Sequence, residues 1–305
     1  MLIITIEFIF DVAFASDAYF IYQTPGIYIK KIDKQEPELW IKASLKESYG
    51  KALKATPDKS ALISNYGKSL EVTEIDPVKK SAGSSTKIAT GRITGSIKDF
   101  SGLGYRGHRA VVLIDHVWMQ LYVLNNADHK NEYSLVERIY LYPDPEVRKS
   151  CDACRVSVCP ESRFFVVASN KARYYSMNLI QVFELDLVGC FKLRYQGKDP
   201  VTKLSSPLAI SFLGYLEDSL VMSILGQTDR AFSLKTHALR LNTEGSDDKA
   251  SHLRMEPLPW LTSQIAGDKF HKVDSLDGSL MLCDNKCNII RFRYKSVLSN
   301  SDNKN

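Results

Sequence analysis

The feature that most constrains this chain is a short phrase of strand-forming and turn-forming residues that recurs about six times. The clearest copy is Val156–Asp186, in which VSVCPESRFFVVASN leads through an insert to LIQVFELD. Related copies are Asp11–Asp33 and Leu53–Asp76. Repeats with a period of about 20–50 residues are typical of solenoids, propellers and similar arrays. The chain is therefore expected to build one small unit several times.

Each copy divides into three expected strands separated by turns that contain an acidic residue or glycine. The middle strand is continuously apolar, which predicts burial on both faces, whereas its neighbours alternate and are predicted to be half buried. In the clearest copy the three strands are Arg155–Cys159, Phe164–Ala168 and Ile180–Leu185. The remaining triplets are Asp11–Phe14, Tyr19–Tyr22 and Ile27–Ile32; Leu53–Ala55, Ala61–Ser64 and Leu70–Ile75; Leu208–Phe212, Leu220–Ile224 and Ala238–Leu241; and His271–Asp274, Ser279–Leu282 and Ile289–Tyr294.

A degenerate sixth copy is expected at Ala110–Leu124, so the units are spaced by about 43 to 61 residues. This spacing predicts an all-β fold, a β-propeller of six or seven four-stranded blades. The last unit ends after its third strand, and an unassigned strand, Leu2–Ile9, precedes the first unit. Pairing of Leu2–Ile9 with Ile289–Tyr294 would close the ring and leave neither edge unpaired. Glu36–Ser48 is the best helix candidate, although a short surface connection is favoured there.

The phrases Ala55–Asp76 and Val156–Asp186 resemble the repeat of WD40-like β-propellers, with a buried strand, a Pro-Asp-type turn and a variable exit strand. The family's Trp-Asp ending is absent, and Ile75-Asp76 and Leu185-Asp186 stand in its place. The family's side-chain network is therefore not carried over to this chain. The resemblance implies a propeller with protein-binding roles. A pair of β-sandwiches is the alternative architecture, because short strands with regular turns also fit sandwiches.

Composition is that of an ordinary soluble globular protein, with 305 residues, 44% hydrophobic residues, 25% charged residues and a net charge of +5. We expect residues 1–295 to form one domain and residues 296–305 a disordered polar tail. The six cysteines are too sparse for a disulfide scaffold, which predicts reduced thiols and a cytoplasmic location. The alternative is a secreted protein with residues 1–15 as a signal peptide, although Glu7 and Asp11 interrupt the apolar run there.

Motifs for catalysis, cofactors and metals are weak. The pairs Cys151/Cys154 and Cys283/Cys287 have spacings compatible with zinc, but they fall in units that are not neighbours in a ring, so we interpret them as strand thiols. Gly102–Gly107 matches G-x-G-x-x-G but opens a strand rather than a helix, which favours a glycine-rich entry to the third unit. No nucleophile, zincin or P-loop motif occurs. We therefore assign no catalytic, cofactor-binding or metal-binding residue.

The most unusual stretch is Pro77–Arg109, which is basic, contains Asp99 as its one acid, and is poor in large apolar residues. We interpret it as a basic inter-blade loop that is either solvated or partner-binding. The residues 171–178, with Arg and Tyr side chains suited to interfaces, form a second candidate loop. The predicted partner-contact residues are Lys79, Lys80, Lys87, Arg92, Lys98, Arg106, Arg109, Arg173, Tyr174 and Tyr175.

Together these observations favour a non-enzymatic interaction scaffold that is a subunit of a larger assembly and binds one or more proteins. One alternative is a propeller-type enzyme whose Asp, His or Glu side chains converge in the central channel. Another is a binder of anionic surfaces (phosphate, lipid or nucleic acid) through the basic loop. No cofactor is expected.

Overall fold

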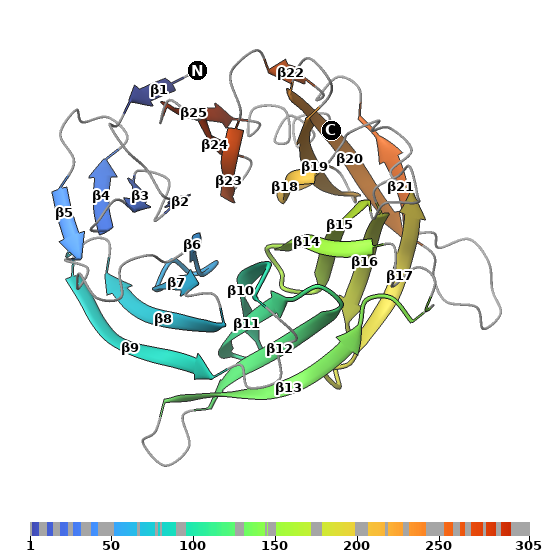
Figure 1. Cartoon of the computed structure of the whole chain (residues 1–305), viewed down its shortest axis with the longest axis horizontal. Helices are drawn as coiled ribbons and strands as arrows, with labels where there is room; N and C mark the ends of the chain where they lie inside the picture. Colours follow the sequence, from blue (N-terminus) through green and yellow to red (C-terminus); the bar gives the residue numbers. More distant parts are fainter. Residues whose placement is uncertain are drawn as a thin grey trace, which may run out of the picture.

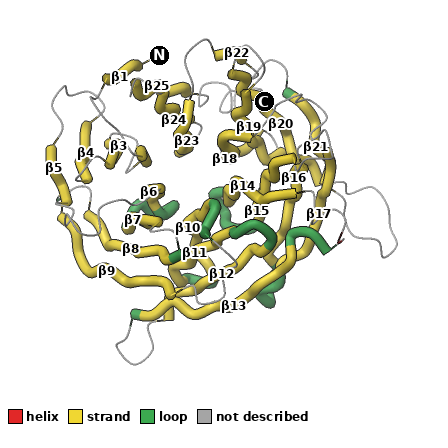
Figure 2. The backbone as a smooth tube through the Cα atoms, viewed as in Figure 1, coloured by secondary structure: helices red, strands yellow, loops and turns green. Residues whose placement is uncertain are grey.

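The structure, a computed structural model, is a ring of antiparallel sheets through which the chain passes in order (Figure 1). Its described backbone consists of strands joined by loops and turns (Figure 2). The described residues are 2–5, 11–14, 19–23, 27–31, 38–41, 52–65, 68–76, 79, 81–89, 96–125, 131–143, 145, 151–171, 179–198, 207–216, 219–227, 232–241, 253–258, 263–265, 270–276, 279–284 and 288–293.

Each sheet is a blade, numbered here in chain order, and its first strand lies nearest the centre of the ring (Figure 1). Blade 1 consists of β2 (Asp11–Phe14), β3 (Tyr19–Gln23), β4 (Ile27–Lys31) and β5 (Glu38–Ile41). Blade 2 consists of β6 (Ala52–Ala55), β7 (Ala61–Asn65), β8 (Ser69–Asp76) and β9 (Ser81–Ala89). Blade 3 consists of β10 (Asp99–Tyr105), β11 (His108–Ile114), β12 (Trp118–Asn125) and β13 (Glu132–Tyr140).

The second half of the chain repeats this plan. Blade 4 consists of β14 (Cys151–Val158), β15 (Phe164–Lys171), β16 (Leu179–Leu185) and β17 (Phe191–Lys198). Blade 5 consists of β18 (Pro207–Leu216), β19 (Ser219–Gln227), β20 (Phe232–Leu241) and β21 (Leu253–Pro257), and β22 (Ser263–Ile265) also pairs with β20. Blade 6 consists of β23 (Phe270–Leu276), β24 (Ser279–Asp284), β25 (Asn288–Arg293) and β1 (Leu2–Thr5).

Blade 6 combines strands from both ends of the sequence. Strand β1 pairs antiparallel with β25, in a register that runs from Leu2 opposite Arg291 to Thr5 opposite Asn288. This is the pairing expected for the N-terminal strand, observed over Leu2–Thr5, while residues 6–10 lie outside the described residues. The innermost strands contact one another in succession, and β23 contacts β2. The described sheets are therefore the six blades of a propeller, and the β-sandwich alternative is wrong.

The predicted first, second and third strands are observed in blades 1, 2, 4, 5 and 6. In blade 3 the predicted pair Ala110–Leu124 is observed as β11 and β12, but the innermost strand β10 was not predicted. Where burial is described, it mostly follows the sequence pattern. All residues of β7 are buried, and β8 alternates between buried and partly exposed positions. Strand β16 differs, because nearly all of it is buried although it is a third strand. Its Phe183 and Leu185 pack with blade 3, and its Ile180 and Val182 pack with blade 5. Because blade 4 packs against blade 3 on one face and blade 5 on the other, its third strand has no exposed face.

The sequence interpretation is wrong for two outermost strands, β5 and β9, and for the innermost strand of blade 3, β10. Pro77–Arg109 is not an inter-blade loop, because it contains β9, β10 and the start of β11. The helix candidate Glu36–Ser48 contains β5, the outer strand of blade 1. Outer strands can lack a buried face, as in β13, where all residues except Tyr133 are exposed or partly exposed.

Gly102 lies where blades 2 and 3 approach most closely. A Cβ atom at this position would lie 3.0 Å from Thr56 Cγ2 and 3.1 Å from Ile63 Cδ1. Gly102 is part of the G-x-G-x-x-G match, and it sits within β10 rather than in a loop before a strand. The motif ends in a two-residue turn in which Arg106 and Gly107 both have positive φ, 49° and 78°. The glycines therefore serve blade packing and a tight hairpin.

Candidate functional site

One face of the ring carries rigid turns with exposed polar and apolar side chains over blades 2 to 4. Antiparallel strands reverse direction at each turn, so the first-to-second and third-to-fourth turns of a blade share one face. We call this the turn face and define it by residues 56–60, 79, 106–107, 159–163 and 186–190. Two surface cavities open on it, of about 540 Å³ between blades 2 and 3 and about 590 Å³ between blades 3 and 4.

The first turn of blade 4 has the same backbone hydrogen bonds as the first turn of blade 2. In blade 2 the N–H of Thr56 donates to Ala61 O and the N–H of Lys59 donates to Thr56 O, both at 2.9 Å. In blade 4 the N–H of Cys159 donates to Phe164 O and the N–H of Ser162 donates to Cys159 O, also at 2.9 Å. Lys59 and Ser162 share a positive φ, 57° and 61°. The Pro-Asp and Pro-Glu phrases of the sequence thus build the same turn twice.

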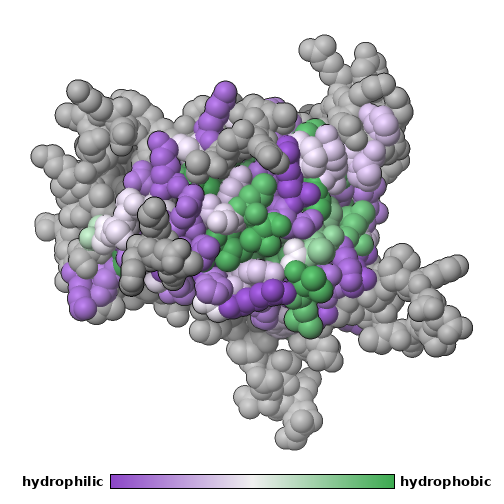
Figure 3. All heavy atoms as spheres, turned by 90° about the horizontal axis from the view of Figure 1, so that it is seen from below, coloured by the Kyte–Doolittle hydropathy of each residue, from purple (hydrophilic) through white to green (hydrophobic). Residues whose placement is uncertain are grey.

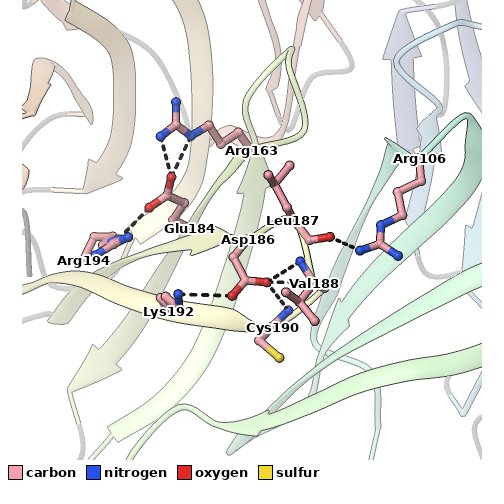
Figure 4. A network of polar contacts seen from close by, with 10 residues as sticks. Arg106, Arg163, Glu184, Asp186, Leu187, Val188, Cys190, Lys192 and Arg194 are labelled. Carbon is pink, nitrogen blue, oxygen red and sulfur yellow. Dashed lines mark hydrogen bonds and ion pairs between the residues drawn. The ribbon is translucent and has the colours of Figure 1, made fainter.

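Glu184 on β16 lines the cavity between blades 3 and 4 and pairs with two arginines there (Figure 4). Arg163 donates to Glu184 Oε1 from Nε at 2.7 Å, and Arg194 donates to Glu184 Oε2 from Nε at 2.6 Å. Burial of the carboxylate raises its pKa, but the hydrogen bonds and charges of the two arginines outweigh this and lower the pKa. Arg194 is the extra residue of a β-bulge in β17, and the bulge places it beside Glu184.

Asp186 fixes the next turn of the same blade (Figure 4). Its Oδ1 accepts hydrogen bonds from the N–H groups of Val188, Gly189 and Cys190, each at 2.9 Å, and its Oδ2 lies 3.2 Å from Lys192 Nζ. The backbone bond from Cys190, with the other N–H groups and Lys192, lowers the pKa of Asp186 against a smaller effect of desolvation. The carboxylate therefore holds this turn in one conformation at neutral pH.

Two aliphatic side chains project from the turn that Asp186 fixes. Leu187 is 93% exposed and Val188 is 78% exposed. Arg106 of blade 3 donates a hydrogen bond to Leu187 O, so the turn is also tied to the neighbouring blade. Seen from the side of the ring, apolar surface gathers in the middle of the described part (Figure 3). Other exposed apolar side chains of blades 3 and 4 are Leu135, Val136, Tyr140 and Leu193.

The cavity between blades 2 and 3 is lined by charged groups. Arg109 Nη2 donates to Ser60 Oγ at 2.7 Å, and Arg109 Nη1 lies 3.7 Å from Glu74 Oε1. Asp58 accepts hydrogen bonds from Ser60 and from Thr56 Oγ1, and these bonds with the nearby Arg109 charge lower its pKa although desolvation alone would raise it. Behind them, burial raises the pKa of Tyr133 to about 12 despite the proximity of Arg109.

The innermost strands carry a different group, centred on Asp99 of β10. Lys54 Nζ lies 2.8 Å from Asp99 Oδ1, and the N–H of Val156 donates to Asp99 Oδ2 at 2.9 Å. Asp99 thus joins the innermost strands of blades 2, 3 and 4. Both of its carboxylate oxygens are bonded to neighbouring blades, which indicates a structural role.

Five of the predicted partner-contact residues lie in the described part of the chain, and all five lie on or beside blades 2 and 3. Arg106 and Arg109 line the two cavities, and Lys79 lies in the turn after β8, where its N–H donates to Asp76. Lys87 lies on the outer strand β9, opposite Glu71, and Lys98 precedes β10. Lys80, Arg92, Arg173, Tyr174 and Tyr175 lie outside the described residues.

Several residues that line the cavity between blades 3 and 4 were missed in the sequence. Arg163, Glu184 and Asp186 belong to the phrase Val156–Asp186 that identified the repeat, but they were treated as turn and strand positions only. Arg194 follows that phrase and was not considered. The repeated Pro-Glu turn and the acidic strand ending could have indicated a shared face. No pattern indicates that the bulge at Arg194 points its side chain to Glu184, because bulges depend on the pairing register.

The described residues hold no group of three or more His, Cys, Asp or Glu side chains placed to bind a metal ion. Cys151 and Cys154 lie on β14 of blade 4 and Cys283 lies on β24 of blade 6, while Cys287 lies outside the described residues. Cys159 and Cys190 are free thiols, the first buried and the second exposed. Within the described part of the chain, no helix has the length and apolarity needed to cross a membrane.

Comparison with known proteins identifies the fold. No protein-family model and no curated protein matches the chain. Similar solved structures include the β-propeller domain of Myceliophteria thermophila Cps50 (Swd1), at 10% identity and a TM-score of 0.50 over 93% of this chain and 83% of that one. A putative 6-phosphogluconolactonase from Bacteroides uniformis matches at 10% identity and a TM-score of 0.60 over 95% and 82%.

A chain in the mitotic checkpoint complex matches at 8% identity and a TM-score of 0.55, over 95% of this chain and 93% of that one. At such identities the likeness concerns the fold alone. These neighbours include WD40 propeller domains, and the four-stranded blades agree with them. The chain is therefore a β-propeller, and its predicted likeness to WD40-like propellers is confirmed at the level of the fold.

Proposed function

We propose that this protein is a non-enzymatic interaction scaffold that binds partner proteins on its turn face and works as a subunit of a larger assembly. The observation that carries the proposal is the turn of residues 186–190, which presents Leu187 and Val188 almost fully exposed on a rigid support. Exposed aliphatic side chains on a pre-ordered turn lose little conformational entropy on binding. A scaffold needs such surfaces, because rigid loops on a stable core provide specificity.

The similar structures are compatible with this proposal without deciding it. One of them belongs to an assembly, the mitotic checkpoint complex, and another is a putative lactonase. Enzymatic activity is the less favoured alternative, because Asp99, one of several acids on the innermost strands, has both oxygens bonded to other blades. Binding of an anionic surface is also less favoured, because Lys87 on β9 and Lys98 before β10 lie apart from the turns that carry Lys79 and Arg106.

The proposed cytoplasmic location rests on the sparse cysteines, of which Cys159 and Cys190 are free thiols in the structure. Fluorescence microscopy of the full chain with a C-terminal fluorescent tag tests this proposal. Diffuse cytoplasmic signal is the expected result. Accumulation in the culture medium or in secretory compartments would contradict it.

Affinity purification of the tagged full chain from its own cells, followed by quantitative mass spectrometry, tests the scaffold function. We expect specific proteins to be enriched over the tag alone and to be lost when Leu187 and Val188 are both replaced by Ser. Replacement of Ser84 by Gln is the control, since this side chain is exposed on the outer strand β9 and should keep the partners. Absence of any enriched protein, also after chemical crosslinking, would contradict the proposal.

A further inference from the structure

The two cavities of the turn face adjoin each other at Gly104. Gly104 and Ser162 line both cavities, and the N–H of Gly104 donates to Ser162 Oγ at 3.0 Å. Gly104 is exposed, and a Cβ atom there would have Ser162 Oγ, 4.0 Å away, as its nearest neighbour. No side chain therefore rises between the cavities at this position. The geometry describes one groove that crosses the turn face from blade 2 through blade 3 to blade 4.

The end of the groove between blades 3 and 4 combines apolar side chains with equal numbers of positive and negative charges. Tyr105, Leu185 and Leu187 contribute its apolar lining. Its charged lining residues are three cations and three anions, Arg106, Arg163 and Arg194 with Glu161, Glu184 and Asp186. Most of these charges engage one another or a neighbouring group, as in the pairing of Glu184 with two arginines. This end offers an apolar ligand a surface on which no single charge dominates.

The other end of the groove, between blades 2 and 3, has an excess of negative charge. Asp58 and Glu74 are its acidic lining residues and Arg109 is its one arginine. The Asp58 carboxylate accepts its hydrogen bonds from uncharged groups of Thr56 and Ser60. Its lowered pKa keeps it ionised at neutral pH. A cationic side chain placed here would gain a charge-assisted hydrogen bond.

We propose that this groove binds an extended segment of a partner protein in which an aliphatic side chain occupies the blade 3–blade 4 end and a lysine or arginine occupies the blade 2–blade 3 end. This inference rests on the proposed scaffold function and names the kind of partner that the face selects. Each cavity is of ordinary ligand-site size, within about 300–1,000 Å³. An extended chain suits a groove that crosses three blades, because it exposes side chains along its length.

The test is selection from a random peptide library displayed on phage against the immobilised full chain, with the enriched peptides then made with a fluorescein label. We expect enriched sequences that combine Leu, Ile or Val with Lys or Arg. Fluorescence anisotropy should show that Gly104→Leu, which fills the middle of the groove, weakens binding about tenfold or more. Ser84→Gln, on the exposed outer strand β9, should leave the affinity unchanged. Circular dichroism and the melting temperature would establish that Gly104→Leu is folded.

The charged end is tested by a double-mutant cycle. The double variant Asp58→Asn/Glu74→Gln should lower the affinity for the selected peptide. It should change the affinity much less for a peptide in which Lys or Arg is replaced by Gln. Failure to enrich any sequence, enrichment of acidic sequences, or equal affinity for the parent and Gly104→Leu would overturn the proposal. Self-association of the full chain that Gly104→Leu abolishes would identify a second copy as the occupant and would also overturn it.

These results remain distinct from a failure of the scaffold function itself. If Gly104→Leu still co-purifies the parent's partner proteins and no peptide is selected, the groove proposal is wrong and the scaffold function stands on another surface. If neither peptides nor proteins bind, both proposals are wrong.

Discussion

Thr56 and Cys159 occupy the same position in blades 2 and 4, and each accepts a hydrogen bond from a backbone N–H five residues further along the chain. The N–H of Ala61 donates to Thr56 Oγ1 at 3.0 Å, and the N–H of Phe164 donates to Cys159 Sγ at 3.1 Å. A thiol in one blade thus replaces a hydroxyl in another. Burial raises the pKa of Cys159 to about 11, so this thiol is protonated at neutral pH.

This equivalence predicts that Cys159→Thr leaves stability nearly unchanged, because the hydroxyl can accept the same hydrogen bond. Cys159→Val has a similar shape but no acceptor, and it should lose about 1–3 kcal/mol because the N–H of Phe164 becomes unsatisfied in a buried position. Urea denaturation followed by circular dichroism measures both variants. Equal stability of the Thr and Val variants would contradict a role for the acceptor.

Asp99 is predicted to be a main support of the ring between blades 2 and 4. Asp99→Ala leaves the N–H of Val156 and the ammonium of Lys54 without this partner, which should lower the free energy of unfolding by about 2–4 kcal/mol. The control is Lys79→Gln, because Lys79 pairs with Asp76 at 3.5 Å while its side chain is 80% exposed, and its loss should change stability by less than about 1 kcal/mol. Similar losses for both variants would contradict the prediction.

Acid should destabilise the turn face through Glu184. Its pKa is lower in the folded chain than its unfolded value of about 4.3, so its stabilising contribution is complete above that pH and is lost as the pH falls below it. Urea midpoints measured between about pH 7 and pH 3 should decline less steeply for Glu184→Gln than for the parent, although the variant starts from lower stability. Parallel pH profiles would show that Glu184 does not contribute to acid sensitivity.

Gly102 and Gly104 lie two residues apart on β10 but should respond oppositely to substitution. Gly102→Val must displace Thr56 or Ile63 of the neighbouring blade and should cost about 1–3 kcal/mol. Gly104→Val enters open space beside Ser162 and should stay within about 0.5 kcal/mol of the parent. Thermal unfolding of the two variants makes the comparison. A larger loss for Gly104→Val than for Gly102→Val would contradict the described packing between blades 2 and 3.

Most inner strands of the blades were predictable from sequence, because buried strand positions are occupied by apolar residues. Strands β7 and β11 contain continuous apolar runs, Ala61–Ile63 and Ala110–Ile114, and the turns after the first strands of blades 2 and 4 contain Pro-Asp and Pro-Glu. Their recurrence predicted the propeller architecture.

The outer strands have no such apolar pattern. Leu135 and Val136 on β13 are exposed apolar residues, whereas β9 contains Gly83, Ser84 and Ser85, so the fourth strands share no common pattern. They are strands because the third strand beside them offers unpaired backbone groups, as β8 does to β9. The basic stretch was consequently interpreted as a loop, and its cations were expected on one surface.

The sequence by itself determined the repeated unit, most of the inner strands and many of the turns of this protein, because these depend on local hydrophobic periodicity and turn chemistry. It did not indicate β10, the innermost strand of blade 3. Only the tertiary structure decided the outer strands, the β-bulge that brings Arg194 to Glu184, and the meeting of two cavities at Gly104 and Ser162, which are 58 residues apart. Such features depend on pairing register and on contact between neighbouring blades. Both are set by the packing of the whole ring rather than by any short segment.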